Sequence, residues 1–75
     1  MRKQRTTVRR VTVSLREADV INLEFISACT GLGQNDVIRK ALATEAFVQE
    51  QLLLGGALLV ENPETGQIRQ VAFVG

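Results

Sequence analysis

The sequence contains no histidine, tryptophan or tyrosine, one proline and one cysteine. Without histidine or a second cysteine, the chain has no intramolecular disulfide and no ordinary zinc site to stabilise it. The lone Cys29 suits a reducing compartment, so we expect a cytoplasmic protein in which this thiol is a small buried hydrophobic side chain. No apolar run is long enough to cross a bilayer, and no signal-peptide pattern follows the basic first residues.

The same shortages leave no recognisable set of catalytic side chains. Ser14 and Ser27 have no evident base partner, and the eight acidic residues are scattered without the spacing of metal ligands or paired carboxylates. The Gly31-Leu-Gly33 sequence lacks the spacing and the βαβ context of a dinucleotide-binding loop. We therefore expect a protein that is not an enzyme and that uses no metal, cofactor or small-molecule ligand.

The size of the chain indicates a second copy as partner, and its charge distribution indicates a polyanion. A chain of 75 residues buries only about 60% of its extended surface when it folds alone, so a core shared between copies is expected. Residues 1–16 carry six basic side chains and no acidic one, whereas residues 17–75 carry three basic and eight acidic ones. A basic arm on an acidic body indicates a polyanionic partner, although a solvated tail has the same composition.

After a basic arm of residues 1–7, which we expect to be flexible, the pattern predicts a strand near Val8–Leu15. There the apolar side chains alternate with polar ones, which is the period of a half-buried strand. The apolar set is Val11, Val13 and Leu15, and the polar set is Arg10, Thr12 and Ser14. Such a strand needs a partner for its backbone. It either joins a C-terminal hairpin or pairs with the same strand of a second chain.

Two helices and a hairpin are expected to follow. Residues 17–30 contain no glycine or proline and end at Gly31, which predicts a helix. A second helix starts after Gly33 as N-cap and stops at Gly55–Gly56. The runs 57–61 and 67–74 flank a turn sequence and predict a β-hairpin.

The predicted elements contain more apolar residues than their own packing requires. On the first helix, Val20, Leu23 and Ile26 share one face, and Ile21, Phe25 and Cys29 form a second stripe that we interpret as core. Two hairpin strands cannot bury their own apolar side chains. We therefore expect the hairpin to cover helices, either within one dimer or in a neighbouring dimer.

The chain resembles the ribbon-helix-helix (Arc/MetJ-type) DNA-binding protein family over roughly residues 9–52. The resemblance rests on the strand Arg10-Val-Thr-Val-Ser-Leu15, the helix after it, the Gly31-Leu-Gly33 turn and the run Asp36-Val-Ile-Arg-Lys-Ala-Leu42. It implies an α+β fold in which two chains intertwine through an intermolecular antiparallel β-ribbon. Residues 8–55 would form this domain, and the hairpin of residues 56–75 is an extension that the basic fold lacks.

The resemblance also implies a site. The outward side chains of the ribbon, here Arg10, Thr12 and Ser14, would contact bases in the major groove of double-stranded DNA. The amino end of the second helix would hold a phosphate through its backbone amides. Together with basic residues of the arm, the positions expected to contact phosphate are Arg2, Lys3, Arg5, Arg9, Gly33, Gln34 and Asn35. The family often has Ser or Thr where this chain has Gly33 and Asn35, so a hydroxyl contact is missing at Gly33.

These features favour a transcriptional repressor that binds an operator as a homodimer. A plasmid copy-control or partition protein is a variant of this function. An antitoxin that neutralises a toxin and binds its own promoter is an alternative, but its C-terminal segment is typically disordered when free. A small assembly protein whose hairpin drives oligomerisation is a further alternative, and in that case the basic arm is incidental.

Overall fold

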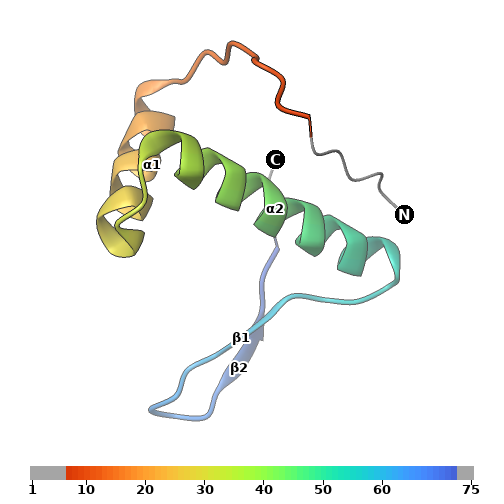
Figure 1. The fold of residues 1–75 in the computed structure, drawn as a ribbon. Coiled ribbons are helices and arrows are strands. Elements are labelled where there is room, and N and C mark those ends of the chain that lie inside the picture. The colour runs from red at the N-terminus through yellow and green to blue at the C-terminus, as the bar shows by residue number, and fades with distance from the viewer. Residues whose placement is uncertain (1–6, 73–75) are drawn as a thin grey trace.

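The computed structural model describes residues 7–72 and shows a small α+β chain (Figure 1). Helix α1 spans Glu17–Thr30 and helix α2 spans Gln34–Leu53. Strands β1, Leu59–Glu61, and β2, Ile68–Gln70, pair antiparallel. The two helices pack against each other, and the two strands form a separate hairpin.

The junction between the helices follows the predicted glycine turn. Gly31 adopts a left-handed conformation with φ of 73°, and its amide donates to the carbonyl of Ser27 over 2.8 Å. This conformation is favourable for glycine, so α1 ends where the sequence predicts. Helix α2 begins after Gly33, whose carbonyl accepts from the amide of Val37 over 2.9 Å.

Helix α2 ends in a comparable way at a pair of glycines. Gly55 has φ of 84°, and the amide of Gly56 donates to the carbonyl of Gln51 over 2.9 Å. A Cβ atom on Gly56 would lie 2.9 Å from that carbonyl oxygen, closer than side-chain atoms approach. The predicted stop at these glycines is confirmed, and the chain turns away from the helices there.

The hairpin is confirmed with shorter strands than the sequence indicates. The register pairs Leu59 with Gln70 and Glu61 with Ile68. The loop is fixed by Asn62, whose side-chain oxygen accepts from the amide of Glu64 over 2.9 Å and whose backbone carbonyl accepts from Gly66 over 2.7 Å. The predicted run to Val74 extends past the described residues.

The core of this single chain is very small. Among the described residues, only Val37 and Val48 are buried apolar side chains. The accessible surface is 7393 Å², whereas a folded monomer of 8.2 kDa exposes about 4,500 Å². The radius of gyration is 15.2 Å, against about 11 Å for a compact domain of this length. One chain therefore leaves unburied much of the surface that folding normally covers.

Two predictions of burial or pairing are not met within one chain. Thr7–Arg16 has no regular secondary structure, and the sheet described here contains only β1 and β2, so the segment does not join the hairpin. The prediction that Cys29 is buried is wrong for this chain, because its thiol is exposed. Ile21 and Phe25, on the same stripe, are exposed as well. The reason is that α2 packs on the opposite side of α1.

Candidate nucleic-acid interface

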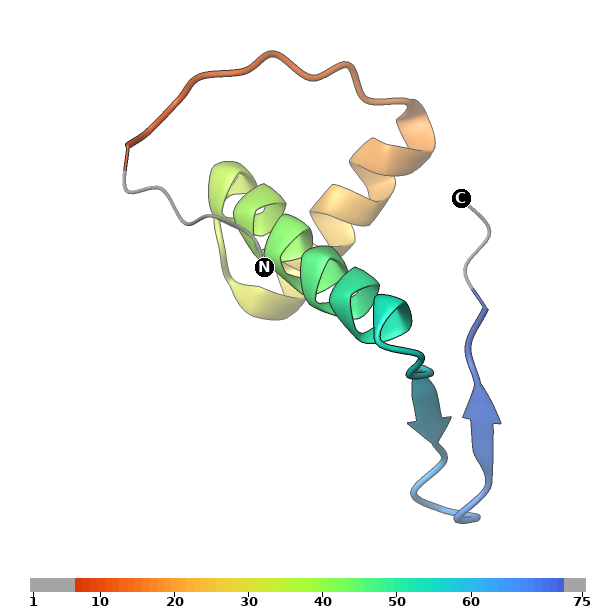
Figure 2. The same ribbon diagram turned by 90° about the vertical axis from the view of Figure 1, so that its right-hand side faces the viewer.

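The extended segment before α1 is open to solvent on both sides. Every residue from Thr7 to Arg16 is exposed, and the segment arches over the helices in both views (Figures 1 and 2). Val11 is 73% and Val13 59% accessible. Fully burying a valine stabilises a fold by roughly 1.5–3 kcal/mol. Covering these two side chains would therefore add stability that the single chain lacks.

Leu15 indicates which side of the segment faces the helices. It lines an open hollow between α1 and α2 together with Leu23, Val37 and Ile38. Side chains two apart in an extended segment share a side. In a fully extended strand, Val11 and Val13 would lie on the side of Leu15, and Arg10, Thr12 and Ser14 on the side that faces away from the helices.

The start of α1 is fixed by a hydrogen bond that the sequence analysis did not anticipate. The backbone amide of Arg16 donates to Oδ2 of Asp19 over 3.0 Å, and the Arg16 carbonyl accepts from the amide of Val20 over 3.0 Å. A carboxylate in the first turn also interacts favourably with the helix dipole. The carboxylate of Asp19, three residues after Arg16, is thus held at the helix start.

The amino end of α2 presents backbone amides without a side-chain cap. Gly33, Gln34 and Asn35 are exposed, and Gly33 provides no capping hydrogen bond. The first amides of a helix have no intrahelical acceptor, so they are free to bind an anion. The three residues predicted to contact phosphate are therefore accessible at one helix end.

Asp36 brings a negative charge to this helix end, but its carboxylate is paired. It accepts a hydrogen bond and salt bridge from Arg39, one turn further along α2. Both side chains are largely exposed, so the pair adds little stability. Its consequence is local: Arg39 offsets the charge of Asp36 beside the free amides. The spacing of three residues could have revealed this pair in the sequence.

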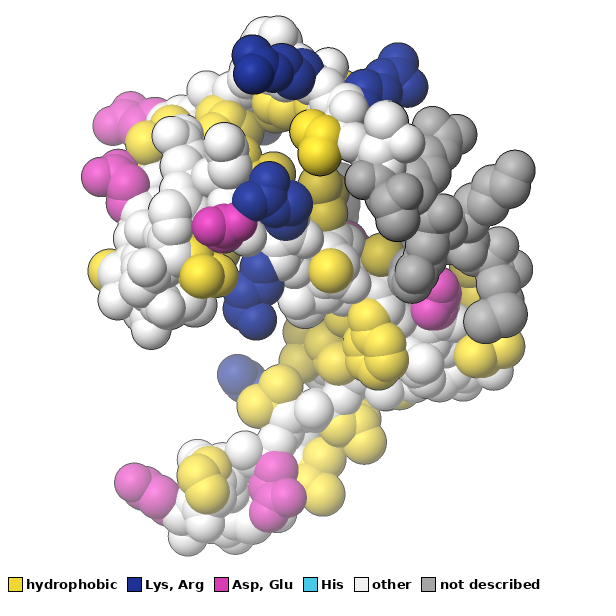
Figure 3. Space-filling view, in the orientation of Figure 1, with side chains coloured by type: hydrophobic (Ala, Val, Ile, Leu, Met, Phe, Trp, Pro, Cys, Tyr) yellow, Lys and Arg dark blue, Asp and Glu magenta, His cyan; other side chains and the backbone are white. Residues whose placement is uncertain are grey.

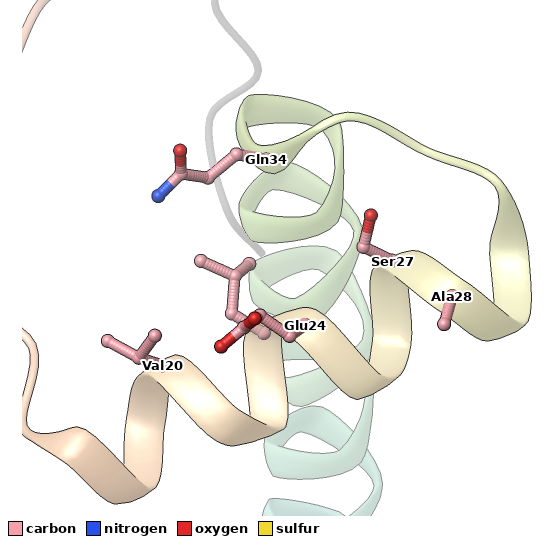
Figure 4. A pocket seen from close by; sticks show the side chains of 6 residues that line it. Val20, Glu24, Ser27, Ala28 and Gln34 are labelled. Atoms are coloured by element: carbon pink, nitrogen blue, oxygen red, sulfur yellow. The ribbon is translucent and has the colours of Figure 1, made fainter.

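Ser27 positions the turn that carries these amides. Its hydroxyl donates to the carbonyl of Leu32 over 2.6 Å, and Thr30 accepts from the amide of Leu32 over 3.3 Å. Figure 4 shows Ser27 pointing toward the turn, beside a hollow between the helices that Val20, Glu24 and Gln34 also line. From the sequence, Ser27 is a serine without an evident base partner, and a single serine gives no signal of its hydrogen-bond acceptor.

Charge is distributed unevenly over the molecule. The segment before α1 carries basic side chains without acidic ones, whereas acidic side chains lie on the helices and the hairpin together with the remaining basic ones (Figure 3). Arg9 and Arg10 are exposed. The predicted contacts Arg2, Lys3 and Arg5 lie outside the described residues. The candidate interface therefore consists of the extended segment and the start of α2.

No protein-family model, curated protein or solved structure matches the chain. Within residues 7–72, no helix combines the length and apolar character needed to cross a bilayer. The same part of the chain contains no cluster of three or more metal-ligating side chains.

Proposed function

We propose that this protein is a sequence-specific DNA-binding regulator of transcription, a repressor, that acts as a ribbon-helix-helix homodimer. The observation that carries the proposal is the segment Thr7–Arg16, which is exposed on an apolar and on a polar side. A second copy supplies what this segment lacks. Two such segments, paired antiparallel, would satisfy each other's backbone and place their valines over the helices.

Base recognition is assigned to the polar side of this ribbon. Arg10 can form two hydrogen bonds with the edge of a guanine, and Thr12 and Ser14 can donate or accept at several bases. A two-stranded ribbon fits the major groove. Because the dimer presents the same side chains twice, its binding site should have dyad symmetry.

Phosphate binding is assigned to the basic segment and to the start of α2. The exposed amides of Gly33, Gln34 and Asn35 are suited to one phosphate. Arg9 and the arm residues Arg2, Lys3 and Arg5 would add contacts that bring affinity and salt dependence without sequence preference.

The experiment starts with selection of binding sites from a pool of random duplexes by the full chain. Arg10→Ala, Thr12→Ala and Ser14→Ala are then titrated against the selected site. Each should weaken binding by about 1–3 kcal/mol if its side chain makes a good base contact. Arg69→Ala is the matched control, because it removes the same charge from the hairpin and should leave the affinity unchanged.

Two results would contradict the proposal. One is a selection that enriches no sequence. The other is a set of three alanine variants that bind the selected site as tightly as Arg69→Ala.

A further inference from the structure

We propose that the C-terminal hairpin docks on the outer face of α1 of a second copy of this chain. The outer face of α1 is defined by Ala18, Ile21, Phe25 and Cys29. The inference concerns self-association and does not depend on DNA binding.

The outer face of α1 is apolar and uncovered in its own chain. Its four residues recur at helical spacing and include no charged side chain. Ile21 is 58% and Phe25 67% exposed. Leu23 and Ile26 line the hollow against α2 on another side of the helix, so α2 cannot reach the outer face.

The hairpin has a partly apolar surface, which we call its open face: Ala57, Leu59, Ile68 and Ala72, together with the polar Glu61 and Gln70, which pair with Ile68 and Leu59 across the strands. Val60, Asn62, Gln67 and Arg69 line a hollow on one side of the sheet. Because side chains alternate along a strand, Leu59 and Ile68 lie on the other side. They are 57% and 59% exposed. A two-stranded hairpin is marginal in water on its own, so this face needs a surface to cover it.

The chain cannot bring its own two surfaces together in this fold. Neither β1 nor β2 contacts α1 or α2. The chain leaves the far end of α2, and the hairpin lies below the helix pair in both views (Figures 1 and 2). Helix α2, Gln34–Leu53, has 20 residues and is about 30 Å long, and the hairpin follows its far end.

The two surfaces match in length, and the exposed area of the chain is large enough for a dimer interface. From Ala18 to Cys29 the outer face of α1 runs about 16 Å along the helix, and from Ala57 to Glu61 the strand rises about 13 Å. The chain exposes 7393 Å², about 2,900 Å² more than a folded monomer of its mass. Obligate homodimers bury areas of this order. Both surfaces are present on every copy, so no other protein is needed to cover them.

The test uses the native Cys29 as one half of a crosslink in the full chain without DNA. Ile68→Cys places a second thiol on the open face, and Arg69→Cys, the matched control, places it on the opposite side of the same strand. After mild oxidation, Ile68→Cys should yield several times more disulfide-linked dimer than Arg69→Cys. Mass spectrometry should locate the link between Cys29 and position 68 of different chains.

A second measurement follows the reactivity of Cys29 toward a thiol reagent. Leu59→Arg disrupts the open face and should speed labelling of Cys29. Thr65→Arg adds the same charge in the hairpin loop and should leave the labelling rate unchanged. The proposal is overturned by equal crosslinking of Ile68→Cys and Arg69→Cys, by a link within a single chain, or by dimer crosslinks that persist when Cys29→Ser is added. Failure to bind DNA would leave these results unaffected.

Discussion

Thr12 and Val13 are neighbours in an extended segment, and both are exposed in the single chain. Their side chains would have different roles in a dimer. An apolar side chain on the side of Leu15 gains free energy when a second copy covers it, whereas a hydroxyl on the opposite side remains available to a ligand. Exposure in one chain therefore does not distinguish their roles, but an identical substitution at each position does.

We predict that Val13→Asp prevents stable folding and that Thr12→Asp does not. In the proposed dimer, the first substitution buries a charge without a partner, which costs several kcal/mol. The second places a charge on the outward side, where it weakens DNA binding by repulsion. Circular dichroism, chemical denaturation and sedimentation of both variants measure the difference. If the chain folded as a monomer, both exposed positions would tolerate the change within about 0.5 kcal/mol.

Among the elements, the α1–α2 turn depends on side chains as well as on glycine. Gly31 provides the left-handed conformation, and Ser27 and Thr30 bind the backbone of Leu32. The turn thereby sets where α2 begins and which way its free amides point. A change at Ser27 should affect both stability and the geometry of the proposed phosphate site.

We expect Ser27→Ala to lower the free energy of unfolding by about 0.5–1.5 kcal/mol, the usual net contribution of one hydrogen bond. Ser14→Ala removes the same hydroxyl from an exposed position and should change stability by less than about 0.5 kcal/mol. Urea denaturation measures both. Equal stabilities of the two variants would show that the hydroxyl of Ser27 does not hold the turn.

The elements were predictable from the sequence to different degrees, for physical reasons. The carboxyl ends of α1 and α2 follow from Gly31 and the Gly55–Gly56 pair, because left-handed conformations and helix ends are local properties. The strand predicted near Val8–Leu15 is absent from the single chain, and the proposed dimer would supply its pairing partner. Periodicity located the stripe of Cys29 but could not say what covers it, so the prediction of burial was wrong.

At the scale of the whole molecule, the candidate interface and the hairpin are separated by α2. The extended segment lies on one side of the helix pair and the hairpin on the other (Figures 1 and 2). The segment before α1 carries basic side chains and no acidic one, whereas the helices and the hairpin carry charges of both signs (Figure 3). The basic segment and the hairpin are therefore separate surfaces of one chain.

The open shape of the chain leads to a prediction about its thermal stability. Two buried valines in the described part of the chain are too few to offset the conformational entropy that folding costs. Folding and association should then be one process, and the thermal midpoint should rise with protein concentration. A tenfold increase contributes about 1.4 kcal/mol, which corresponds to about 3–5 °C for a dimer of this size. Calorimetry over a hundredfold range measures the trend. A midpoint independent of concentration, together with a folded monomer in sedimentation at the lowest concentration, would contradict the dimeric architecture and with it the proposed DNA-binding ribbon.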